Sequence, residues 1–470
     1  MSTTAITTAP PDLQFGEATP HATPQAALAR LMAVRPAAYA RSRNHLQGAV
    51  TGLSPYLTHG LLTLPQVLSH LGQVHGLDAQ HKLVFELGWR AYFAHVWRCE
   101  GPQIFESMRS GVLPDSAYAH ELPADIRQAT TGLPVIDQAV RCLYNSGYLH
   151  NHARMWLASY VVHLRKVHWR AGADWMVGHL LDGDLASNHL SWQWVAGTAS
   201  ARPYLFNAAN VARYAPPDWH CAGSVIDTTY EVLQRVAADP AAVLLQRGPL
   251  LRGSPPSQED DAAAPSAWGI SEPPLQHQPD RALMQALAWQ APNAETVRGQ
   301  DVWLVHPWCL ADPPAGCMAV AVLDADFFVR WPWSERRWRF VTARMQALTR
   351  HRWWGSNAEI LQALQSARSV RGVYNLHLGP NFAPQSGERV LPLQGAVSGA
   401  LSGKVPAAVQ LSLSPEPAPF LEPTVRCRSF SAYWAKVNQH PIPALQASHP
   451  KHSAPSHAPY EAPVQGELFK

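Results

Sequence analysis

Three short stretches of the sequence combine polar, charged and aromatic side chains in a way that suits a binding site. They are the runs His150-Asn151-His152-Ala153-Arg154-Met155, Asp182-Gly183-Asp184-Leu185-Ala186-Ser187-Asn188 and Trp192-Gln193-Trp194. Amides, a guanidinium and two carboxylates are poor material for a plain core, because each buried polar group needs a partner. The same groups are well suited to holding a flat, polar, redox-active ring.

An earlier segment carries a second set of reactive side chains. Glu86, Trp89 and Arg90 are three and four residues apart, so a helix over Lys82–Arg98 would present all three on one face. Taken alone, this set is better explained by a surface ion pair beside a half-buried indole.

The charged residues of the three stretches have two interpretations. Asn151, Arg154 and Met155 share one helical face, and Asp182 and Asp184 stand in a turn where both carboxylates can reach one spot. In the first interpretation, the guanidinium and the carboxylates form a structural ion pair that clamps two helices. In the second, Asn151 bonds a ring nitrogen and Arg154 stabilises a ring anion, as charged neighbours do when they tune a flavin.

The chain is rich in tryptophan, with 18 residues. Several of the indoles gather near the three stretches, namely Trp156, Trp169, Trp175, Trp192 and Trp194. Such indoles are often core residues, since tryptophan is mostly buried. They can also relay electrons to a cofactor or stack on bases, which is worth roughly 1–3 kcal/mol per base.

The composition limits the class of protein. A chain of 470 residues is too long for one ordinary domain, so we expect two domains with tails. The net charge of +3 does not by itself indicate nucleic-acid binding, although a local basic groove is compatible with it. The six cysteines form no CxxC pair, which argues against a disulfide framework or a zinc site and fits a reducing compartment.

Several common signals are missing from the sequence. The N-terminus lacks a charged region followed by an apolar stretch, and no long uncharged apolar segment occurs, so we expect a cytoplasmic protein without membrane spans. The histidines show no HExxH spacing, so no metal site is expected. Gly-rich loops of the GxGxxG or GKS type are absent, which argues against a Rossmann or P-loop nucleotide site.

Gly, Pro, Asn and Asp residues separate the periodic segments of the sequence, and the pattern predicts two folded domains. We expect a disordered tail over residues 1–24, a helical domain over 25–250, a linker over 251–298, an α/β domain over 299–440 and a disordered tail over 441–470. The first domain has predicted helices at Ala26–Val34, Leu64–Leu71, Lys82–Arg98, Ile136–Ser146, Ala153–Trp169 and Trp175–Leu181. The second has predicted strands at Asp301–Val305, Ala319–Leu323 and Val370–Leu376, and a helix at Trp338–Thr349.

Taken in order, the motifs of the first domain resemble the FAD-binding domain of the photolyase/cryptochrome family. The resemblance covers roughly residues 35–215. It rests on Thr51-Gly52-Leu53-Ser54-Pro55-Tyr56-Leu57, Glu86-Leu87-Gly88-Trp89-Arg90, Thr131-Gly132-Leu133-Pro134 with Asp137, Gly147-Tyr148-Leu149-His150-Asn151 with Arg154-Met155, and Asp182-Gly183-Asp184 with Asn188 and Trp192-Gln193-Trp194. Each motif alone is weak, but five in the family's order are specific.

The resemblance implies an all-α domain that binds FAD in a bent conformation, followed here by a smaller α/β domain. By motif position, the FAD phosphates would contact Tyr39, Thr51, Leu53 and Ser54. The flavin and its ribityl or adenine side would be lined by Arg90, Asn151, Arg154, Asp182, Asp184 and Asn188.

The resemblance also implies a reaction and a partner. In photolyases the excited reduced flavin donates an electron to a pyrimidine dimer that is flipped out of UV-damaged DNA, because chemistry on a stacked base requires its extrusion. By motif position Glu86 would hydrogen-bond the lesion, with Trp89, Trp194 and Met155 packed beside it. The residues matching the proximal and middle members of the electron relay are Trp192 and Trp169.

The second domain is similar in two places to the α/β antenna domain that normally precedes the FAD domain in this family. These places are Asp324-Ala325-Asp326 with Ser334-Glu335-Arg336-Arg337-Trp338-Arg339-Phe340, and Arg428-Ser429-Phe430-Ser431-Ala432-Tyr433-Trp434. The resemblance therefore implies a permuted domain order. It leaves open whether a second, antenna chromophore binds there.

Three functions are compatible with this resemblance. The first is a deoxyribodipyrimidine photolyase-like lyase, active as a monomer on UV-damaged DNA, and the lesion-facing residues favour it. The second is a cryptochrome-like FAD photoreceptor without repair activity, and the third is a light-independent flavin-binding module. His152 replaces the family's usual arginine, and the segment Tyr204–Asn210 lacks the family's usual basic residue; both differences favour the second or third function.

Overall fold

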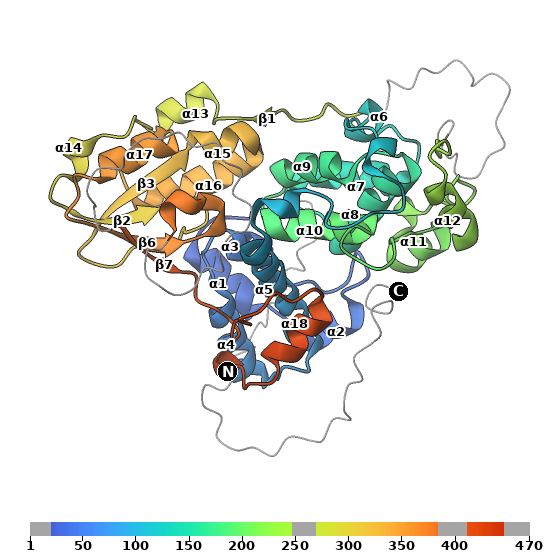
Figure 1. Cartoon of the computed structure of the whole chain (residues 1–470), viewed down its shortest axis with the longest axis horizontal. Helices are drawn as coiled ribbons and strands as arrows, with labels where there is room; N and C mark the ends of the chain where they lie inside the picture. Colours follow the sequence, from blue (N-terminus) through green and yellow to red (C-terminus); the bar gives the residue numbers. More distant parts are fainter. Residues whose placement is uncertain (1–19, 247–268, 384–410, 446–470) are drawn as a thin grey trace, which may run out of the picture.

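The computed structural model describes residues 20–246, 269–383 and 411–445. Figure 1 shows an α/β domain on one side, the later helices of a helical domain on the other, and the earlier helices of that domain in the lower middle, with α5 (Lys82–Glu100) running between the two sides. The tails expected at 1–24 and 441–470 lie mostly outside the described residues, and helix α1 already begins at Pro24.

The helices predicted for the helical domain are present, although the one predicted at Trp175–Leu181 begins earlier, at Trp169, and one other is interrupted. Its α-helices are α1 (Pro24–Met32), α2 (Pro36–Ser42), α3 (Ser54–Thr58), α4 (Leu64–His75), α5, α6 (Ala124–Arg127), α7 (Pro134–Ser146), α8 (Asn151–Ser159), α9 (Trp169–His179), α10 (Leu185–Ala196), α11 (Ala208–Tyr214) and α12 (Tyr230–Ala238). Local caps set many of these bounds. Thr63 and Gln66 form a capping box that starts α4, and Gly76 ends it in the left-handed conformation.

One predicted helix is interrupted. The apolar pattern predicts a continuous helix over Ala153–Trp169, but α8 ends at Ser159 and continues as one π-helical turn over Tyr160–Leu164. Lys166 then adopts a positive φ of 52°, and its ammonium donates to carbonyl oxygens of His163 and Val236 at 2.7 and 2.6 Å. A hydrogen-bond partner 70 residues away thus bends the chain where the local pattern continues.

The α/β domain contains one parallel sheet of five strands. The strands are β2 (Asp301–Val305), β3 (Met318–Asp324), β5 (Arg352–Gly355), β6 (Ser369–Tyr374) and β7 (Leu411–Pro415), in the order β5-β3-β2-β6-β7. Helices α15 (Ala325–Arg330), α16 (Glu335–Leu348) and α17 (Asn357–Leu364) alternate with them. The predicted strands and helix are all present, whereas β5 and β7 were missed.

The expected linker over 251–298 contains structure in its described part. Strand β1 (Leu275–Gln276) pairs with β4 (Trp333–Ser334), and α13 (Arg281–Ala286) and α14 (Ala294–Val297) follow it. These elements belong to the α/β domain, which therefore begins earlier than predicted.

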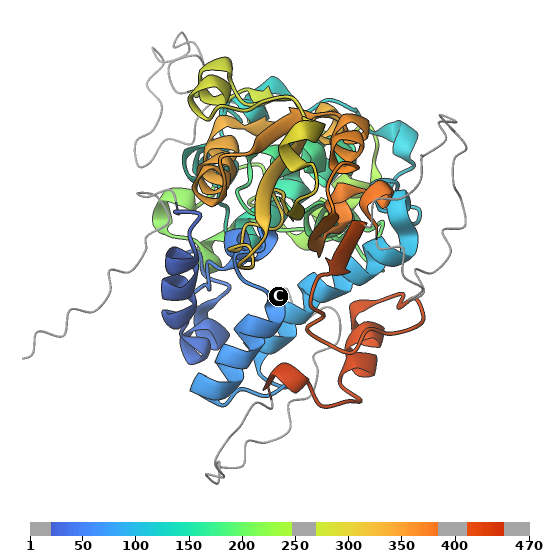
Figure 2. The same cartoon turned by 90° about the vertical axis from the view of Figure 1, so that its left-hand side faces the viewer.

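The last described segment, residues 411–445, returns to the helical domain after β7. Helix α18 (Phe430–Val437) packs on α5, and the turn η9 (Pro443–Leu445) packs on α4. Both views show this segment beside the first helices rather than beside the sheet (Figures 1 and 2). Gly88 makes the approach possible, because a Cβ atom there would lie 2.4 Å from the Trp434 ring.

A buried guanidinium joins the two domains. Arg337 of α16 is 2% exposed and donates to the carbonyl oxygens of Val177 at 2.8 Å and Gly183 at 2.5 Å. Its guanidinium also lies 4.0 Å from the centre of the Trp333 ring. Burial lowers the pKa of Arg337 to about 9, and Asp182 and Asp184 partly offset this effect.

Buried neutral histidines predict that the protein is sensitive to acid. Burial lowers the pKa of His163 and His306 to about 4 and that of His377 to about 3. The unfolded chain takes up these protons as the pH falls below about 6.5, whereas the folded protein does not, so each ring costs about 2 kcal/mol of stability at pH 5. This contribution to stability is complete above about pH 6.5 and is lost as the pH falls from there towards 4.

We therefore expect the melting temperature to drop steeply between pH 7 and pH 5, measured by circular dichroism. His163→Phe removes one titrating group and should flatten this dependence, even if it lowers stability at neutral pH. A wild-type melting temperature that stays constant over the range would contradict the prediction.

Candidate functional site

The polar residues singled out in the sequence meet around one cavity of the helical domain, here called the inner cavity, with a volume of about 340 Å³. Its wall comes from α2, α3, α5, α8, α10 and the turns before them. The predicted residues that line it are Tyr39, Thr51, Ser54, Glu86, Trp89, Arg90, Asn151, Arg154, Met155, Asp182, Asp184, Asn188, Trp192 and Trp194.

Helix α5 contributes a carboxylate, an indole and a guanidinium, as its spacing predicts. Glu86 is held at the wall by two cations, with Lys82 Nζ at 2.9 Å and Arg43 Nε at 3.5 Å from its Oε1. Arg90 donates to the Thr58 hydroxyl at 3.2 Å. These contacts hold the side chains of Glu86 and Arg90 in place without a ligand.

A tight turn positions the residues of α8. Gly147 ends α7 with a φ of 66°, and the His150 side chain caps α8 by accepting from the amide of His152. Asn151 at the first helical position therefore faces the cavity and is exposed to it. Arg154, one turn on, donates from Nε to the carbonyl oxygen of Leu149 at 2.7 Å.

The turn Asp182-Gly183-Asp184 brings two carboxylates to the wall, each with its own cation. Asp182 receives Arg154 Nη2 at 3.0 and 2.9 Å from its two oxygens. Asp184 is the N-cap of α10 and lies 3.7 Å from Arg90 Nη2. These ion pairs agree with the first interpretation, a structural clamp between helices. The second interpretation, in which Asn151 and Arg154 tune a flavin, stays a prediction.

A residue of the α/β domain, His377, contacts the start of α10 beside Asp184. His377 accepts the amide N–H of Leu185 at Nε2, 3.2 Å away, and donates from Nδ1 to the Asn375 side chain at 2.5 Å. Its ring stacks on Trp308 at 4.6 Å with an interplanar angle of 13°. Burial raises the pKa of Asp184, but Arg90 and His377 together with Ser187 hold it below the usual value.

The two indoles of α10 have different surroundings. Trp192 is 2% exposed and lies against α9 where Gly172 leaves room, because a Cβ atom there would be 2.3 Å from the indole. Trp194 is half-buried and faces the opening. Trp169, buried in the same core as Trp192, donates to the Ser107 hydroxyl at 3.0 Å and does not line the cavity.

Two groups of predicted residues lie away from the inner cavity. Leu53, expected beside phosphates, is 1% exposed and packs in the core. The Thr131-Gly132 motif is a structural cap, because Asp137 accepts both of its amides, at 2.9 and 3.1 Å.

Sequence reasoning also missed part of the wall. Arg43 and Asn44 line the cavity but stood in none of the motifs. Tyr148 and His150 also line it; both stood in the motifs but were given no role.

The inner cavity fits a polar heterocycle better than a metal. The wall offers amides, paired charges and apolar surface from Leu57 and Ala158. His152 adds a buried Nε2 atom that has no hydrogen-bond partner within the described part of the chain. Across the described residues, no group of three or more His, Cys, Asp or Glu side chains is arranged to hold a metal, and no helix has the length and apolar character of a membrane span.

Comparisons with known proteins match part of the helical domain to photolyases and cryptochromes. Residues 83–221 match the family model described as the FAD binding domain of DNA photolyase. The chain is 33% identical over 163 residues to a deoxyribodipyrimidine photo-lyase of Streptomyces griseus, covering 34% of this chain and 35% of the relative. It is 31% identical over 211 residues to a cryptochrome DASH of Ostreococcus tauri, covering 43% of this chain and 38% of the relative.

The matches are partial in both sequence and structure. The chain spans little more than a third of the length of these curated relatives. A cryptochrome of Synechocystis superposes with a TM-score of 0.37 and 26% identity, covering 41% of this chain and 43% of the other.

The contact between His377 and α10 predicts an effect on the cavity from outside the helical domain. His377→Ala leaves the Leu185 amide without its acceptor, at a cost of about 1–3 kcal/mol, and loosens the N-cap Asp184. We expect a lower melting temperature and FAD affinity weakened about tenfold, measured by flavin fluorescence titration. His440→Ala, at an exposed position of the C-terminal segment, is the control; equal FAD affinities for the two variants would refute this coupling.

Proposed function

We propose that this chain, a member of the photolyase/cryptochrome family by its FAD binding domain, is a light-dependent flavoenzyme that repairs pyrimidine dimers in UV-damaged DNA. The observation that carries the proposal is the inner cavity, whose flavin-side residues and lesion-side residues open onto one space. Asn151, Arg154 and Asp184 line the same cavity as Glu86, Trp89 and Trp194. A flavin-binding module without a substrate would not require the second set.

Bound FAD, in its reduced form, supplies an electron when it absorbs blue light. The chain's own residues position the ring and the substrate. Asn151 offers an uncommitted amide oxygen to the ring, and Arg154 with Asp182 forms a fixed pair beside it. Glu86, anchored by Lys82, provides hydrogen-bond acceptors for the edge of an extruded base.

The indoles divide their work between substrate and electron supply. Trp89 and Trp194 offer ring faces to unstacked bases at the opening. Trp192 and Trp169 share one core behind the cavity, and we assign them to the relay that returns electrons to the cofactor.

We further infer that the α/β domain is the antenna domain of the family, moved behind the FAD domain. Its parallel sheet with alternating helices and the closing helix α18 support this order. All six cysteines are unpaired, which fits a reducing compartment such as the cytoplasm.

The direct test is light-dependent repair. The protein, loaded with FAD, should remove dimers from UV-irradiated oligothymidylate under blue light and not in darkness, as followed by chromatography of the products. A flavin spectrum without dimer loss would leave the photoreceptor function instead. A protein that stays colourless after reconstitution would overturn the flavin assignment itself.

Stacking on Trp194 predicts a specific loss of substrate affinity. Trp194→Ala removes one ring face, worth roughly 1–3 kcal/mol, so dimer-containing DNA should bind about 5- to 150-fold more weakly. The control is Trp303→Phe, at a half-buried position of β2. If both variants bind the DNA as the wild type does, Trp194 does not stack on the substrate.

Asn151 predicts the redox behaviour of the bound flavin. Asn151→Asp places a carboxylate on the cavity wall, and its charge disfavours additional negative charge on the reduced ring. Photoreduction should stop at an earlier redox state or proceed more slowly, as recorded by absorption spectroscopy under blue light. Unchanged spectra and rates would show that Asn151 does not contact the ring.

A further inference from the structure

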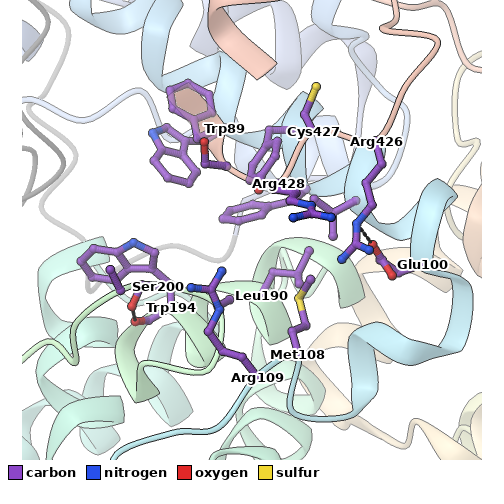
Figure 3. A pocket seen from close by; sticks show the side chains of 17 residues that line it. Trp89, Glu100, Met108, Arg109, Leu190, Trp194, Ser200, Arg426, Cys427 and Arg428 are labelled. Carbon is purple, nitrogen blue, oxygen red and sulfur yellow. Dashed lines mark hydrogen bonds and ion pairs between the residues drawn. The ribbon is translucent and has the colours of Figure 1, made fainter. Parts of the chain in front are cut away.

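A second pocket, here called the outer pocket, adjoins the inner cavity and is partly built by the end of the chain. It has a volume of about 240 Å³ and shares Trp89, Phe93 and Trp194 with the inner cavity. One wall belongs to residues 426–430, which precede and begin α18, and the opposite side includes Met108 and Arg109 (Figure 3). No residue of the 426–430 wall was among the predicted site residues.

This C-terminal wall is firmly attached to α5. His95 donates from Nδ1 to Glu422 at 2.6 Å and accepts the Cys427 amide at Nε2, 3.1 Å away. Phe430 stacks on Trp89 with ring centres 4.0 Å apart and an interplanar angle of 12°. The ring of Phe430 thereby fixes the plane of an indole that faces both cavities.

The arginines that line the outer pocket differ in whether they have a carboxylate partner. Arg426 forms an ion pair with Glu100. Arg109 and Arg428 are exposed and, among the described residues, make no hydrogen bond or ion pair. Figure 3 shows them reaching into the pocket from opposite sides. The carboxylate that lines this pocket, Glu100, is paired with Arg426, so the two other guanidinium groups indicate an anionic ligand.

The aromatic residues that line the outer pocket indicate which kind of anion would bind there. Guanidinium groups beside ring faces suit nucleic acid, because bases stack on the indoles while phosphates pair with the arginines. An acidic peptide would use the charges but has no bases to stack on the indoles.

Building on the proposed function, we propose that Arg109 and Arg428 clamp the phosphates flanking the extruded nucleotides. The C-terminal wall therefore completes the DNA site, which combines residues of the helical domain with residues of the last described segment. Arg428 is a binding residue for the backbone, and Phe430 is a positioning residue that acts through Trp89.

The test measures how salt weakens the binding of fluorescent oligothymidylate to the FAD-loaded full chain. Arg109→Gln and Arg428→Gln should each reduce affinity and lower the slope of log affinity against log salt by about 0.7, since each removes one phosphate contact to a single strand. Arg109→Lys and Arg428→Lys keep the charge and should keep the slope. Arg281→Gln, at an exposed position of α13, is the charge-matched control and should behave as the wild type.

The outcomes separate the clamp from the repair reaction. Slopes unchanged in both glutamine variants, no binding by the wild type, or displacement of the oligonucleotide by oligoglutamate at equal charge would each overturn the clamp. Salt-dependent binding through both arginines without loss of dimers in light would retain the clamp and refute repair. Normal flavin spectra in all variants would show that the inner cavity is intact.

Discussion

The rest of the structure depends on one buried contact, between Arg337 of the α/β domain and the turn at Asp182–Asp184. A buried guanidinium is costly unless its donors are used, and here Nη1 and Nη2 bond the carbonyl oxygens of Val177 and Gly183. Within the described part of the chain, Nε has no hydrogen-bond partner. Those oxygens belong to the end of α9 and to the turn itself, so the contact fixes the backbone between two cavity carboxylates. The two domains are thus joined at the wall of the site.

Support from distant parts of the chain recurs around the site. His377 stands behind Asp184, and Phe430 stands behind Trp89. These two cavity side chains come from the helical domain, whereas the residues that support them come from far along the sequence. A permuted order of domains is compatible with this arrangement, because the packing depends on which surfaces meet and not on the order in which the chain supplies them.

The sequence predicted those parts of the site that short-range patterns determine. The common face of Glu86 and Arg90 follows from helical spacing, and most of the predicted residues do line the inner cavity. The sequence pattern gave no indication of contacts between distant parts of the chain. Strand β5 is a short Arg-Trp-Trp-Gly run that becomes a strand only by pairing with β3, and α18 shows no local sign that it packs on α5. Residue Arg428 could therefore not be placed at a pocket in advance.

The distribution of charge distinguishes the two cavities. In the inner cavity each arginine already has a carboxylate, as Arg154 has Asp182 and Arg90 has Asp184. A bound ring therefore contacts a polar wall whose charges are already paired, and its binding breaks few ion pairs. Such a site suits a resident cofactor whose affinity changes little with salt. In the outer pocket Arg109 and Arg428 are left without carboxylates, so the incoming ligand itself supplies the countercharge. That site suits an anionic partner which binds and leaves, and whose affinity falls as salt rises.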